Sequence, residues 1–492
     1  MNSLHHFPRT SFIGNRFVGT PSTSASAATG NGRAIVDPSS GSSLLHVFDA
    51  TEQHVNDAVS AAKHAFDGGE WRINAAKRRD ALLAIAESIE ENRNLLAEAE
   101  ALTGRPIKDA GLDVDACVET FKFFAGFTDK MHGRFFPPTP TYNSYTMREP
   151  IGVCGLITSF NYPLLLASWK LAPCLAAGNT AVLKPAHQTP LSSLLLAKLI
   201  SSKHLLPEGV FNVVLGDAEV GKELVAHPDV SKVSFTGSTT AVTGSSVATL
   251  LAQPYPRRGT FELGGKNAII VFDDADLDLA MHHVLDAAFS NSGQNCCAAS
   301  RLILHESIHD TFVSLLTQRA REINLGDALD PNTTMGPLVH PTSRDRAVTA
   351  IHAAVRDGSR LVLDGSDRAT SREGFFLGPT ILCGVAPESS LAQTELFAPV
   401  LAILPPFRTR EEAVAMANAT RYGLAGGVFS RDVGTVRYVV SKLRVGLVWV
   451  NAYNDVPPHL PLGGLKGSGY GYECGFEAVH EYTTVKSVYS AY

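Results

Sequence analysis

The sequence predicts an α/β protein with two parallel-sheet domains and a small additional β element. The chain has 492 residues, which is too long for one ordinary hydrophobic core. From about residue 150, buried-strand patterns such as "IGVCGLITSF" alternate with helical ones such as "YPLLLASWKLAPCLAAG". A second alternating stretch covers residues 267–450, and such alternation with short connections is typical of βαβ units in a parallel sheet.

The N-terminal part carries two further patterns. Residues 18–45 are rich in Ser, Ala, Thr and Gly, which predicts a surface excursion. A helical spacing of apolar residues then predicts one long amphipathic helix, which "TGRP" ends. The apolar positions are Leu82, Ile85, Ile89 and Leu96. The sequence has no internal repeat, heptad or metal-ligand spacing, so we expect no metal.

Composition limits the class of partner. The chain is 45% hydrophobic and 18% charged, which is typical of a soluble globular protein. Its formal net charge of −6 disfavours nucleic acid or an anionic membrane as the main partner. We expect neither a membrane span nor a secretory signal. The seven cysteines are mostly scattered singly, which indicates a reducing compartment and a cytoplasmic location.

Two short stretches carry candidate chemistry. "FELGGKN" places Glu262 before a glycine pair, and "SGQNCC" places Cys296 34 residues further on, directly before Cys297. Taken alone, Cys296 reads as a small buried residue and Glu262 as a surface acid. Further polar and glycine-rich stretches accompany them: "SFNYP", "VLKPAHQTP", "SFTGST", "TELFAPV" and "LPLGGLKGSGYGYECG".

Together these stretches resemble the NAD(P)-dependent aldehyde dehydrogenase superfamily, from "SFIGNRFV" near the start to "EYTTVKSV" near the end. The resemblance implies two Rossmann-like parallel-sheet domains, the aldehyde dehydrogenase fold, with a small β oligomerisation element. It assigns residues 1–127 and 151–262 to the NAD(P)-binding domain and residues 263–460 to the catalytic domain. Residues 128–150 and 477–492 form the oligomerisation element, so we expect a homodimer or a homotetramer.

The resemblance also implies a covalent mechanism for oxidation of an aldehyde to the carboxylic acid. Cys296 follows Gly, Gln and one variable residue, as the family's nucleophile does, and Cys297 is a packing neighbour. The Cys296 thiolate attacks the aldehyde, and the Asn161 amide and the Cys296 N–H stabilise the oxyanion. Glu262 is the general base that hydrolyses the thioester, which favours water over coenzyme A as the acyl acceptor.

A second pair of residues is implied to move the proton away from this base. Lys170 and Glu473 match the family's relay positions, whereas a helix-surface lysine and a simple salt-bridge partner are the alternative interpretations. A non-catalytic structural member of the fold is a further alternative. The joint presence of Cys296, Glu262 and Asn161 argues against it.

The cofactor positions come from the same resemblance. Lys184 contacts the adenosine ribose, and Glu395 contacts the nicotinamide ribose. Gly237 and Ser238 hold the pyrophosphate at a strand-to-helix turn. Phe397 lies near the nicotinamide. We therefore expect NAD as the cofactor, with NADP as a possible second one.

Two departures from the family pattern bear on the cofactor. His187 stands where many relatives have a glutamate that repels the 2′-phosphate of NADP. With an unperturbed pKa of about 6.5, His187 is expected to be partly protonated near pH 6 and to attract that phosphate. The next glycine after Gly237 is Gly244, which indicates a two-residue insertion in the phosphate turn.

The substrate tunnel is expected to contain Tyr162, Trp169 and Tyr453. "FNYPLLLASWKLAP" and "NAYNDVPPHLPLGG" resemble the betaine-aldehyde and aminoaldehyde branch, and three aromatic rings can bind an ammonium group through cation–π attraction. An ordinary apolar tunnel for aliphatic or aromatic aldehydes is the alternative. A semialdehyde dehydrogenase that prefers NADP is another, so the sequence leaves the aldehyde open.

Overall fold

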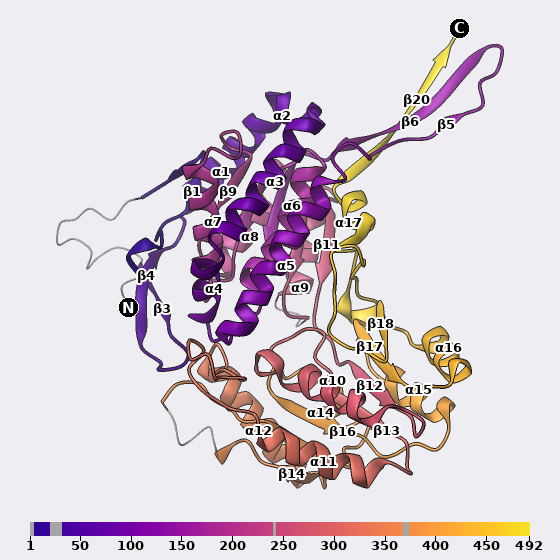
Figure 1. Cartoon of the computed structure of the whole chain (residues 1–492). Helices are drawn as coiled ribbons and strands as arrows, with labels where there is room; N and C mark the ends of the chain where they lie inside the picture. Colours follow the sequence, from indigo (N-terminus) through magenta and orange to yellow (C-terminus); the bar gives the residue numbers. More distant parts are fainter. Residues whose placement is uncertain (1–3, 20–31, 240–242, 368–372) are drawn as a thin grey trace.

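The structure is a computed structural model that describes residues 4–19, 32–239, 243–367 and 373–492. Figure 1 shows two α/β bodies, one built mainly from the first half of the chain and one from later residues. A long β hairpin projects from the first body together with the C-terminal strand. The predicted α/β class with two mostly parallel sheets is confirmed.

The first sheet has eight strands within the described residues, in the order β19-β11-β10-β7-β8-β9-β1-β2. Its five central strands run parallel, whereas β19, β1 and β2 pair antiparallel at the two ends. The parallel strands are β7 (Val153–Ile157), β8 (Thr180–Lys184), β9 (Phe211–Val213), β10 (Val230–Thr236) and β11 (Arg258–Glu262). The end strands are β1 (Phe12–Ile13), β2 (Arg16–Phe17) and β19 (Gly469–Tyr470). The strand order reverses between β7 and β10, and ligands bind at the carboxyl ends of strands at such a point.

The second sheet has seven strands in the described part of the chain, in the order β14-β15-β16-β13-β12-β17-β18. All its pairs are parallel except β14 with β15. The strands are β12 (Ala268–Val271), β13 (Arg301–Leu304), β14 (Arg360–Leu363), β15 (Thr380–Cys383), β16 (Val400–Ile403), β17 (Ala425–Phe429) and β18 (Leu447–Val450).

The projecting element is a three-stranded antiparallel sheet in the order β20-β6-β5. Its strands are β5 (Phe135–Phe136), β6 (Tyr142–Pro150) and β20 (Thr483–Ala491). Aromatic and aliphatic side chains on it are exposed, notably Phe135, Phe136, Tyr145, Met147, Val485 and Tyr489. An exposed sheet edge with such side chains is suited to pairing with another chain.

The predicted surface excursion over residues 18–45 falls partly outside the described residues, which omit 20–31. Its later part forms an antiparallel hairpin of β3 (Gly32–Val36) and β4 (Ser43–Phe48). Ile35 and Leu45 of this hairpin are buried, so this part packs against the body instead of extending from it.

The single long helix predicted through Leu82 and Leu96 is wrong. The segment forms α3 (Ala75–Glu91) and α4 (Arg93–Ala101), which are separated at Asn92. The Asn92 side-chain amide donates to the Ser88 carbonyl oxygen at 2.8 Å. Asparagine bonds to nearby backbone groups in this way and therefore favours helix ends over helix interiors.

Helices cover both sheets. Around the first sheet lie α1 (Glu52–Asp67), α2 (Glu70–Ile73), α3, α4, α5 (Ile107–Ala125), α6 (Pro163–Ala176), α7 (Leu191–Ser202), α8 (Ala218–Ala226), α9 (Gly244–Leu251) and α17 (Gly475–Glu481). The later helices are α10 (Leu277–Phe289), α11 (His309–Arg321), α12 (Pro341–Arg356), α14 (Ser390–Gln393), α15 (Arg410–Asn418) and α16 (Val433–Lys442). Among the described residues, no helix combines the length and apolar character of a membrane span.

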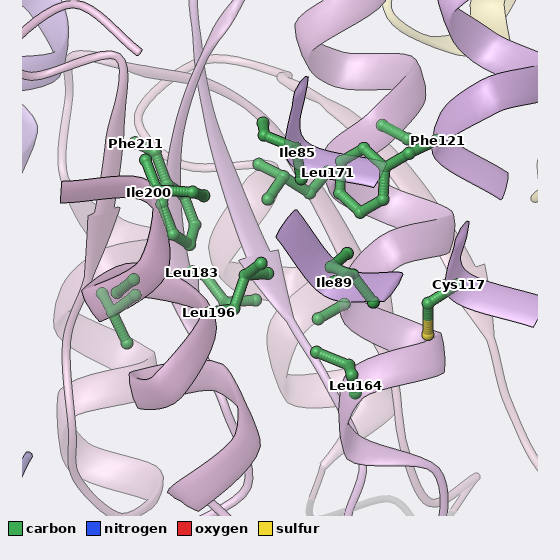
Figure 2. Packing of buried hydrophobic residues seen from close by; sticks show 14 of the residues in the cluster. Ile85, Ile89, Cys117, Phe121, Leu164, Leu171, Leu183, Leu196, Ile200 and Phe211 are labelled. Carbon is green, nitrogen blue, oxygen red and sulfur yellow. The ribbon is translucent and has the colours of Figure 1, made fainter. Parts of the chain in front are cut away.

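The core of the first body lies between its sheet and the helices α3, α5, α6 and α7. Figure 2 shows side chains of this core, among them Ile85, Ile89, Cys117, Phe121, Leu164, Leu171, Leu183, Leu196, Ile200 and Phe211. These side chains are all at most 1% exposed. Their packing fixes α6 against β8, and α6 carries two of the predicted site residues.

Candidate active site

Strand register brings the predicted residues to one edge of the first sheet. Ile157 pairs with Lys184, and Thr236 pairs with Glu262, so β7, β8, β10 and β11 end side by side. Asn161 follows β7 and lies at the same edge. The carboxyl edge of an open parallel sheet is where α/β proteins bind their ligands.

Hydrogen bonds fix the loop that carries Cys296, between α10 and β13. The Asn267 side-chain amide donates to the Cys296 carbonyl oxygen at 2.8 Å and to the Ala298 carbonyl oxygen at 3.0 Å. The Gln294 side-chain carbonyl accepts from the Val339 N–H at 2.9 Å. The Cys296 side chain is only half-buried, so the loop holds the thiol in place while leaving it accessible.

The two adjacent cysteines have different surroundings. Cys297 is buried in the apolar cluster of the second body, and its carbonyl oxygen accepts from the Tyr453 hydroxyl at 2.9 Å. The neighbouring Cys296 thiol, and then burial, raise the pKa of Cys297 well above its usual value. Cys297 is therefore held as a neutral thiol, which favours Cys296 as the reactive one.

Asn161 is tied directly to the cysteine loop. Its side-chain amide donates to the Gln294 carbonyl oxygen at 3.0 Å, and its own carbonyl oxygen accepts from the Asn291 side chain at 2.9 Å. A side-chain amide has two N–H donors, and only this one bond is made by the Asn161 amide nitrogen among the described residues. The other donor has no hydrogen-bond partner among the described residues, and the contact with Gln294 lies two positions along the loop from Cys296.

Glu262 ends β11 and is 5% exposed. Neither of its carboxylate oxygens has a hydrogen-bond partner among the described residues. Burial raises the pKa of Glu262 well above its usual value, and the charges of Glu473 and Cys296 raise it further, whereas Lys170 lowers it. A carboxyl group in this environment can take up a proton near neutral pH.

Lys170 and Glu473 form a buried ion pair, so neither is a surface residue. The Lys170 ammonium lies 2.6 Å from a Glu473 carboxylate oxygen, and their side chains are 1% and 3% exposed. The Ser234 hydroxyl joins both, since it accepts from Lys170 at 3.0 Å and donates to Glu473 at 2.8 Å. The second Glu473 oxygen has no partner within the described part of the chain.

Lys184 lies at the end of β8 and is 5% exposed. Its ammonium donates to the Pro185 carbonyl oxygen at 3.2 Å. Burial, and then the charge of Arg33, lower the pKa of Lys184 to about 8. A buried ammonium without an ion-pair partner among the described residues fits a site that receives polar ligand groups.

The expectation that His187 is partly protonated near pH 6 is wrong. Burial, and then the charges of Arg33 and Lys184, lower the pKa of His187 to about 4. Arg33, on β3, also donates to the His187 carbonyl oxygen and pairs with Asp49 at 2.8 Å. A pKa below the usual 6.5 means that His187 remains neutral at pH 6 and adds no charge that could attract a phosphate.

Glu395 reaches across the glycine pair of "ELGGK". Its carboxylate accepts from the Gly265 N–H at 3.0 Å, and a Cβ atom at Gly264 would lie 2.0 Å from a Glu395 oxygen. Loss of solvent contact raises the pKa of Glu395 to about 7. Phe397 has a left-handed backbone with φ of 57°, and its ring meets Phe160 edge-on at 5.6 Å.

The predicted phosphate turn is described only at its two ends. Gly237 donates its N–H to the Glu262 carbonyl oxygen at 3.0 Å, and Ser238 is exposed. The Ser238 carbonyl oxygen accepts from the N–H of Gly244, which begins α9. The insertion predicted between Gly237 and Gly244 falls on residues 240–242, which lie outside the described residues.

Two of the three aromatic residues predicted for the tunnel, Tyr162 and Tyr453, interact electrostatically with the Cys296 thiol. Trp169 packs against the large apolar cluster of the second body, which Cys296 also borders. The Arg105 guanidinium lies 4.6 Å from the centre of the Tyr162 ring. One face of that ring therefore already carries a cation of the protein.

The sequence interpretation missed several polar residues of this site. Asn267 ends the stretch "FELGGKN" and Asn291 directly precedes "SGQNCC", so their amide side chains were visible signals. Arg33 and Arg105 come from segments with no such pattern, whereas Ser234 is the first residue of "SFTGST". Only the tertiary structure brings them to His187, Tyr162 and the Lys170–Glu473 pair.

The residues present fit a nicotinamide dinucleotide. Lys184 offers a buried ammonium with a single carbonyl partner in the described chain, and α9 begins directly after the predicted phosphate turn. Gly264 leaves the room that the Glu395 carboxylate occupies. These features place donors and an acceptor along the carboxyl edge of the first sheet.

Comparison with known proteins decides the family. A model of the aldehyde dehydrogenase family matches residues 25–488. The chain belongs to the aldehyde dehydrogenase family. The betaine aldehyde dehydrogenase of Bacillus subtilis is 40% identical over 463 residues, which cover 93% of this chain and 94% of that protein. An aldehyde dehydrogenase of Davidiella tassiana is 40% identical over 484 residues, which cover 98% and 95%.

The chain also resembles solved structures and longer curated relatives. A crystal structure of betaine aldehyde dehydrogenase from Staphylococcus aureus in complex with NAD+ superposes with a TM-score of 0.94, at 35% identity, over 100% of this chain and 96% of that one. The mitochondrial 10-formyltetrahydrofolate dehydrogenase of Mus musculus is 39% identical over 491 residues, which cover 98% of this chain and 52% of that protein. The chain thus spans about half the length of this group of curated relatives.

Proposed function

We propose that this chain is an NAD(P)-dependent aldehyde dehydrogenase that oxidises an aldehyde to the carboxylic acid and uses water as the acyl acceptor. One observation carries the proposal: the buried Glu262 carboxylate, without a protein partner among the described residues, lies in electrostatic contact with the Cys296 thiol. A buried base in electrostatic contact with a thiol supplies the groups that thioester formation and hydrolysis require.

In the first half of the reaction, Cys296 is the nucleophile. Its thiolate sulfur forms a bond to the aldehyde carbon, and the carbonyl oxygen becomes an oxyanion. The second N–H of the Asn161 amide and the Cys296 backbone N–H stabilise that oxyanion. NAD(P)+ would supply a hydride acceptor for the oxidation of the thiohemiacetal to a thioester. Lys184 and Glu395 would hold its two riboses, Gly237 and Ser238 would hold its pyrophosphate, and Phe397 would lie near its nicotinamide.

In the second half, Glu262 acts as the general base. It takes a proton from a water molecule while the oxygen of that water attacks the thioester carbon. The C–S bond then breaks, and the carboxylic acid leaves Cys296. Lys170 and Glu473 take the proton onward from Glu262, and the unpartnered second oxygen of Glu473 supports this role.

NAD is the cofactor that we propose, with NADP as an alternative. His187 is neutral and lacks the negative charge of a glutamate, so it does not repel a 2′-phosphate. The NADP alternative therefore rests on the absence of repulsion rather than on attraction by His187. A semialdehyde dehydrogenase that prefers NADP is the second candidate on this ground.

For the substrate, Tyr162, Trp169 and Tyr453 support two classes of aldehyde. The Bacillus subtilis and Staphylococcus aureus relatives are betaine aldehyde dehydrogenases, which favours a cationic aldehyde. The Arg105 guanidinium over the Tyr162 ring favours a neutral aliphatic or aromatic aldehyde instead, because it already uses one ring face.

The remaining assignments belong to the same proposal. Residues 1–127 and 151–262 act as the cofactor domain, 263–460 as the catalytic domain, and 128–150 with 477–492 as the oligomerisation element. The exposed edges of the β20-β6-β5 sheet support a homodimer or a homotetramer. We propose a cytoplasmic location from the seven free cysteines.

A panel of aldehydes with NAD+ or NADP+ tests this function. The panel contains betaine aldehyde, an aminoaldehyde, an aliphatic aldehyde and benzaldehyde, each with and without coenzyme A. We expect reduced cofactor, measured by absorbance, and the free carboxylic acid without coenzyme A. Cofactor reduction that requires coenzyme A would assign the chain to the acyl-transferring class. A chain that reduces neither cofactor with any aldehyde would contradict the proposal.

A further inference from the structure

A chain of side-chain hydrogen bonds leads from the cysteine loop to the surface. The Asn295 amide nitrogen donates to the Asn454 side-chain oxygen at 3.2 Å, and the Asn454 amide nitrogen donates to an Asp286 carboxylate oxygen at 2.7 Å. At the inner end, the Asn295 side-chain oxygen accepts from the Cys297 N–H at 2.9 Å. These three side chains, Asp286, Asn454 and Asn295, form a continuous amide chain of direct hydrogen bonds.

A helix and two loops hold the members of the amide chain. Asp286 lies near the end of α10 and is exposed. Asn454 follows β18 and has a left-handed backbone with φ of 71°, a conformation that asparagine adopts more easily than most residues. The hydroxyl of its neighbour Tyr453 donates to the Cys297 carbonyl oxygen at 2.9 Å. The loop after β18 is therefore anchored directly to the cysteine loop.

The surface carboxylate determines which way each amide faces. An ionised carboxylate only accepts hydrogen bonds, so the Asn454 nitrogen faces Asp286 and the Asn454 oxygen faces Asn295. The Asn295 nitrogen then faces Asn454. The Cys297 N–H fixes the same orientation from the other end, because a backbone N–H only donates. The atom that the amide chain presents to the cysteine loop is therefore an oxygen.

The Cys296 thiol meets this oxygen. Its sulfur lies 3.9 Å from the Asn295 side-chain oxygen and is a weak donor to it. A hydrogen bond to the neutral form of a group disfavours its charged form, and a thiolate has no proton to donate. The Asn295 oxygen thus favours the protonated thiol and fixes the direction of its S–H bond.

The titratable groups around Cys296 are consistent with a neutral thiol. Glu262 at the end of β11, Tyr162 before α6 and Tyr453 after β18 interact electrostatically with the Cys296 thiol. Cys297, in the same loop, does so as well. All four are acidic groups, so none of them supplies a positive charge that would stabilise a thiolate.

We propose that Asp286 and Asn454 are positioning residues that orient the Asn295 amide, whose oxygen holds the resting Cys296 thiol in its protonated form and in one direction. This deepens the proposed function, on which it rests, because it concerns the nucleophile of that reaction. Asn295 occupies the variable position of the cysteine signature, so the signature itself does not supply this amide. Oxidants and alkylating reagents attack the thiolate, and the amide chain therefore protects the nucleophile between turnovers.

The test follows alkylation of Cys296 by iodoacetamide in the full chain, without cofactor or aldehyde, between pH 6 and pH 10. Peptide mass spectrometry distinguishes a label on Cys296 from one on Cys297. Asn295→Leu keeps a similar volume but removes the acceptor oxygen. The alkylation rate at pH 7 should rise by up to about tenfold, as expected for the loss of one hydrogen bond. The pH of the half-maximal rate should fall by up to about one unit.

A second variant tests the orientation of the amide without changing a charge. Asn454→Leu separates Asn295 from Asp286 but leaves the Asn295 oxygen in the chain. The alkylation rate at pH 7 should therefore rise by only about two- to threefold, at the low end of the effect of one hydrogen bond. The matched control is Asp455→Asn, an exposed neighbour on the same loop, which should leave the pH profile unchanged.

Asp286 itself is not substituted, because its charge acts on other groups. Asp109 of α5, Tyr162 and His283 of α10 all interact electrostatically with Asp286. Removal of this carboxylate would change the pH dependence of several groups at once, whereas the two leucine variants keep every charge in place.

A catalytic measurement separates positioning from a general loosening of the loop. Asn295→Leu should slow the initial burst of reduced cofactor, because the sulfur is no longer held in one direction, although the thiol is alkylated faster. An unchanged alkylation profile in Asn295→Leu or in Asn454→Leu overturns the positioning role. A shift that appears only together with labelling of Cys297 overturns it too, since a loosened loop then explains the change.

The two proposals fail in different measurements. A wild-type chain that reduces neither cofactor with any aldehyde contradicts the proposed function. The alkylation profiles need no aldehyde and no cofactor, so they decide on the amide chain independently.

Discussion

The Cys296 loop and the buried Glu262 carboxyl interact with each other but have different surroundings. Neutral amide side chains of Asn161 and Asn267 bind carbonyl oxygens of the cysteine loop at 2.8 to 3.0 Å. Glu262 makes no such bond among the described residues, and its neighbours act on it through charge. A nucleophile needs a fixed position, whereas a base needs a pKa that its surroundings can shift.

The difference also has an energetic side. The amide bonds around Cys296 satisfy buried carbonyl groups and stabilise the fold by about 1 kcal/mol each. An unpartnered buried carboxyl destabilises the fold by about 1–3 kcal/mol or more. Stability is thus reduced at Glu262, where a hydrogen-bonded carboxylate would be a weaker base.

The largest effect is expected at the thiol. Cys296→Ala removes the atom that forms the covalent intermediate, so kcat should fall by on the order of 10⁴–10⁶-fold, as for other enzymes that lose their nucleophile. Cofactor binding, measured by fluorescence titration, should stay nearly intact. The matched control is Cys297→Ala, which should be mild. An active Cys296→Ala and an inactive Cys297→Ala would reverse the assignment.

The next largest effect is expected at Glu262, the proposed general base. Glu262→Gln should slow deacylation by about 10²–10⁴-fold while hydride transfer is spared, because the thiol and its amide neighbours remain. Rapid mixing should then show a burst of reduced cofactor followed by slow turnover. Unchanged steady-state turnover would exclude Glu262 from the mechanism.

The charged surroundings of Glu262 predict an effect on stability. Lys170→Met leaves Glu473 buried without its partner and should lower the free energy of unfolding by about 3–5 kcal/mol. The double variant Lys170→Met/Glu473→Gln should recover most of this loss, since it removes both charges. Denaturant unfolding measures both values, and a double variant as unstable as the single one would contradict the argument.

The same variant predicts a pH shift of known sign. The Lys170 ammonium lowers the pKa of Glu262, so its removal disfavours the carboxylate and raises that pKa. Deacylation requires the carboxylate form of Glu262. The acidic limb of the pH–rate profile for deacylation should therefore move to higher pH. Deacylation rates between pH 5 and 9 check the direction, and a limb that moves to lower pH would be inconsistent with this electrostatic role.

The smallest effect concerns the cofactor edge, away from both pockets. His187→Glu should strengthen the preference for NAD over NADP by about 1.4–2.8 kcal/mol, or about 10–100-fold in kcat/KM. In the wild type, His187 stays neutral between pH 8 and pH 6 because its pKa is about 4. The ratio of kcat/KM for NADP to kcat/KM for NAD should therefore not rise as the pH falls over this range. A ratio that the substitution leaves unchanged would show that His187 does not face the ribose.

The sequence alone determined the alternation of strands and helices and named the residues that we propose carry the chemistry. Periodicity depends on neighbours in the chain, so the two parallel sheets could be predicted. The signature stretches named Glu262 and Cys296 in advance. The predicted single helix through Leu82 and Leu96 was wrong because of a local side-chain hydrogen bond, in which the Asn92 amide separates α3 from α4.

The tertiary structure alone decided the environments of those residues. Arg33 meets the His187 carbonyl oxygen from 154 positions away, and Asn295 meets Asn454 from 159 positions away. The pKa of His187 and the amide chain beside Cys296 follow from these distant contacts and from burial. Desolvation and Coulomb interactions depend on which atoms pack around a group in space, and the order of residues along the chain does not specify that packing locally.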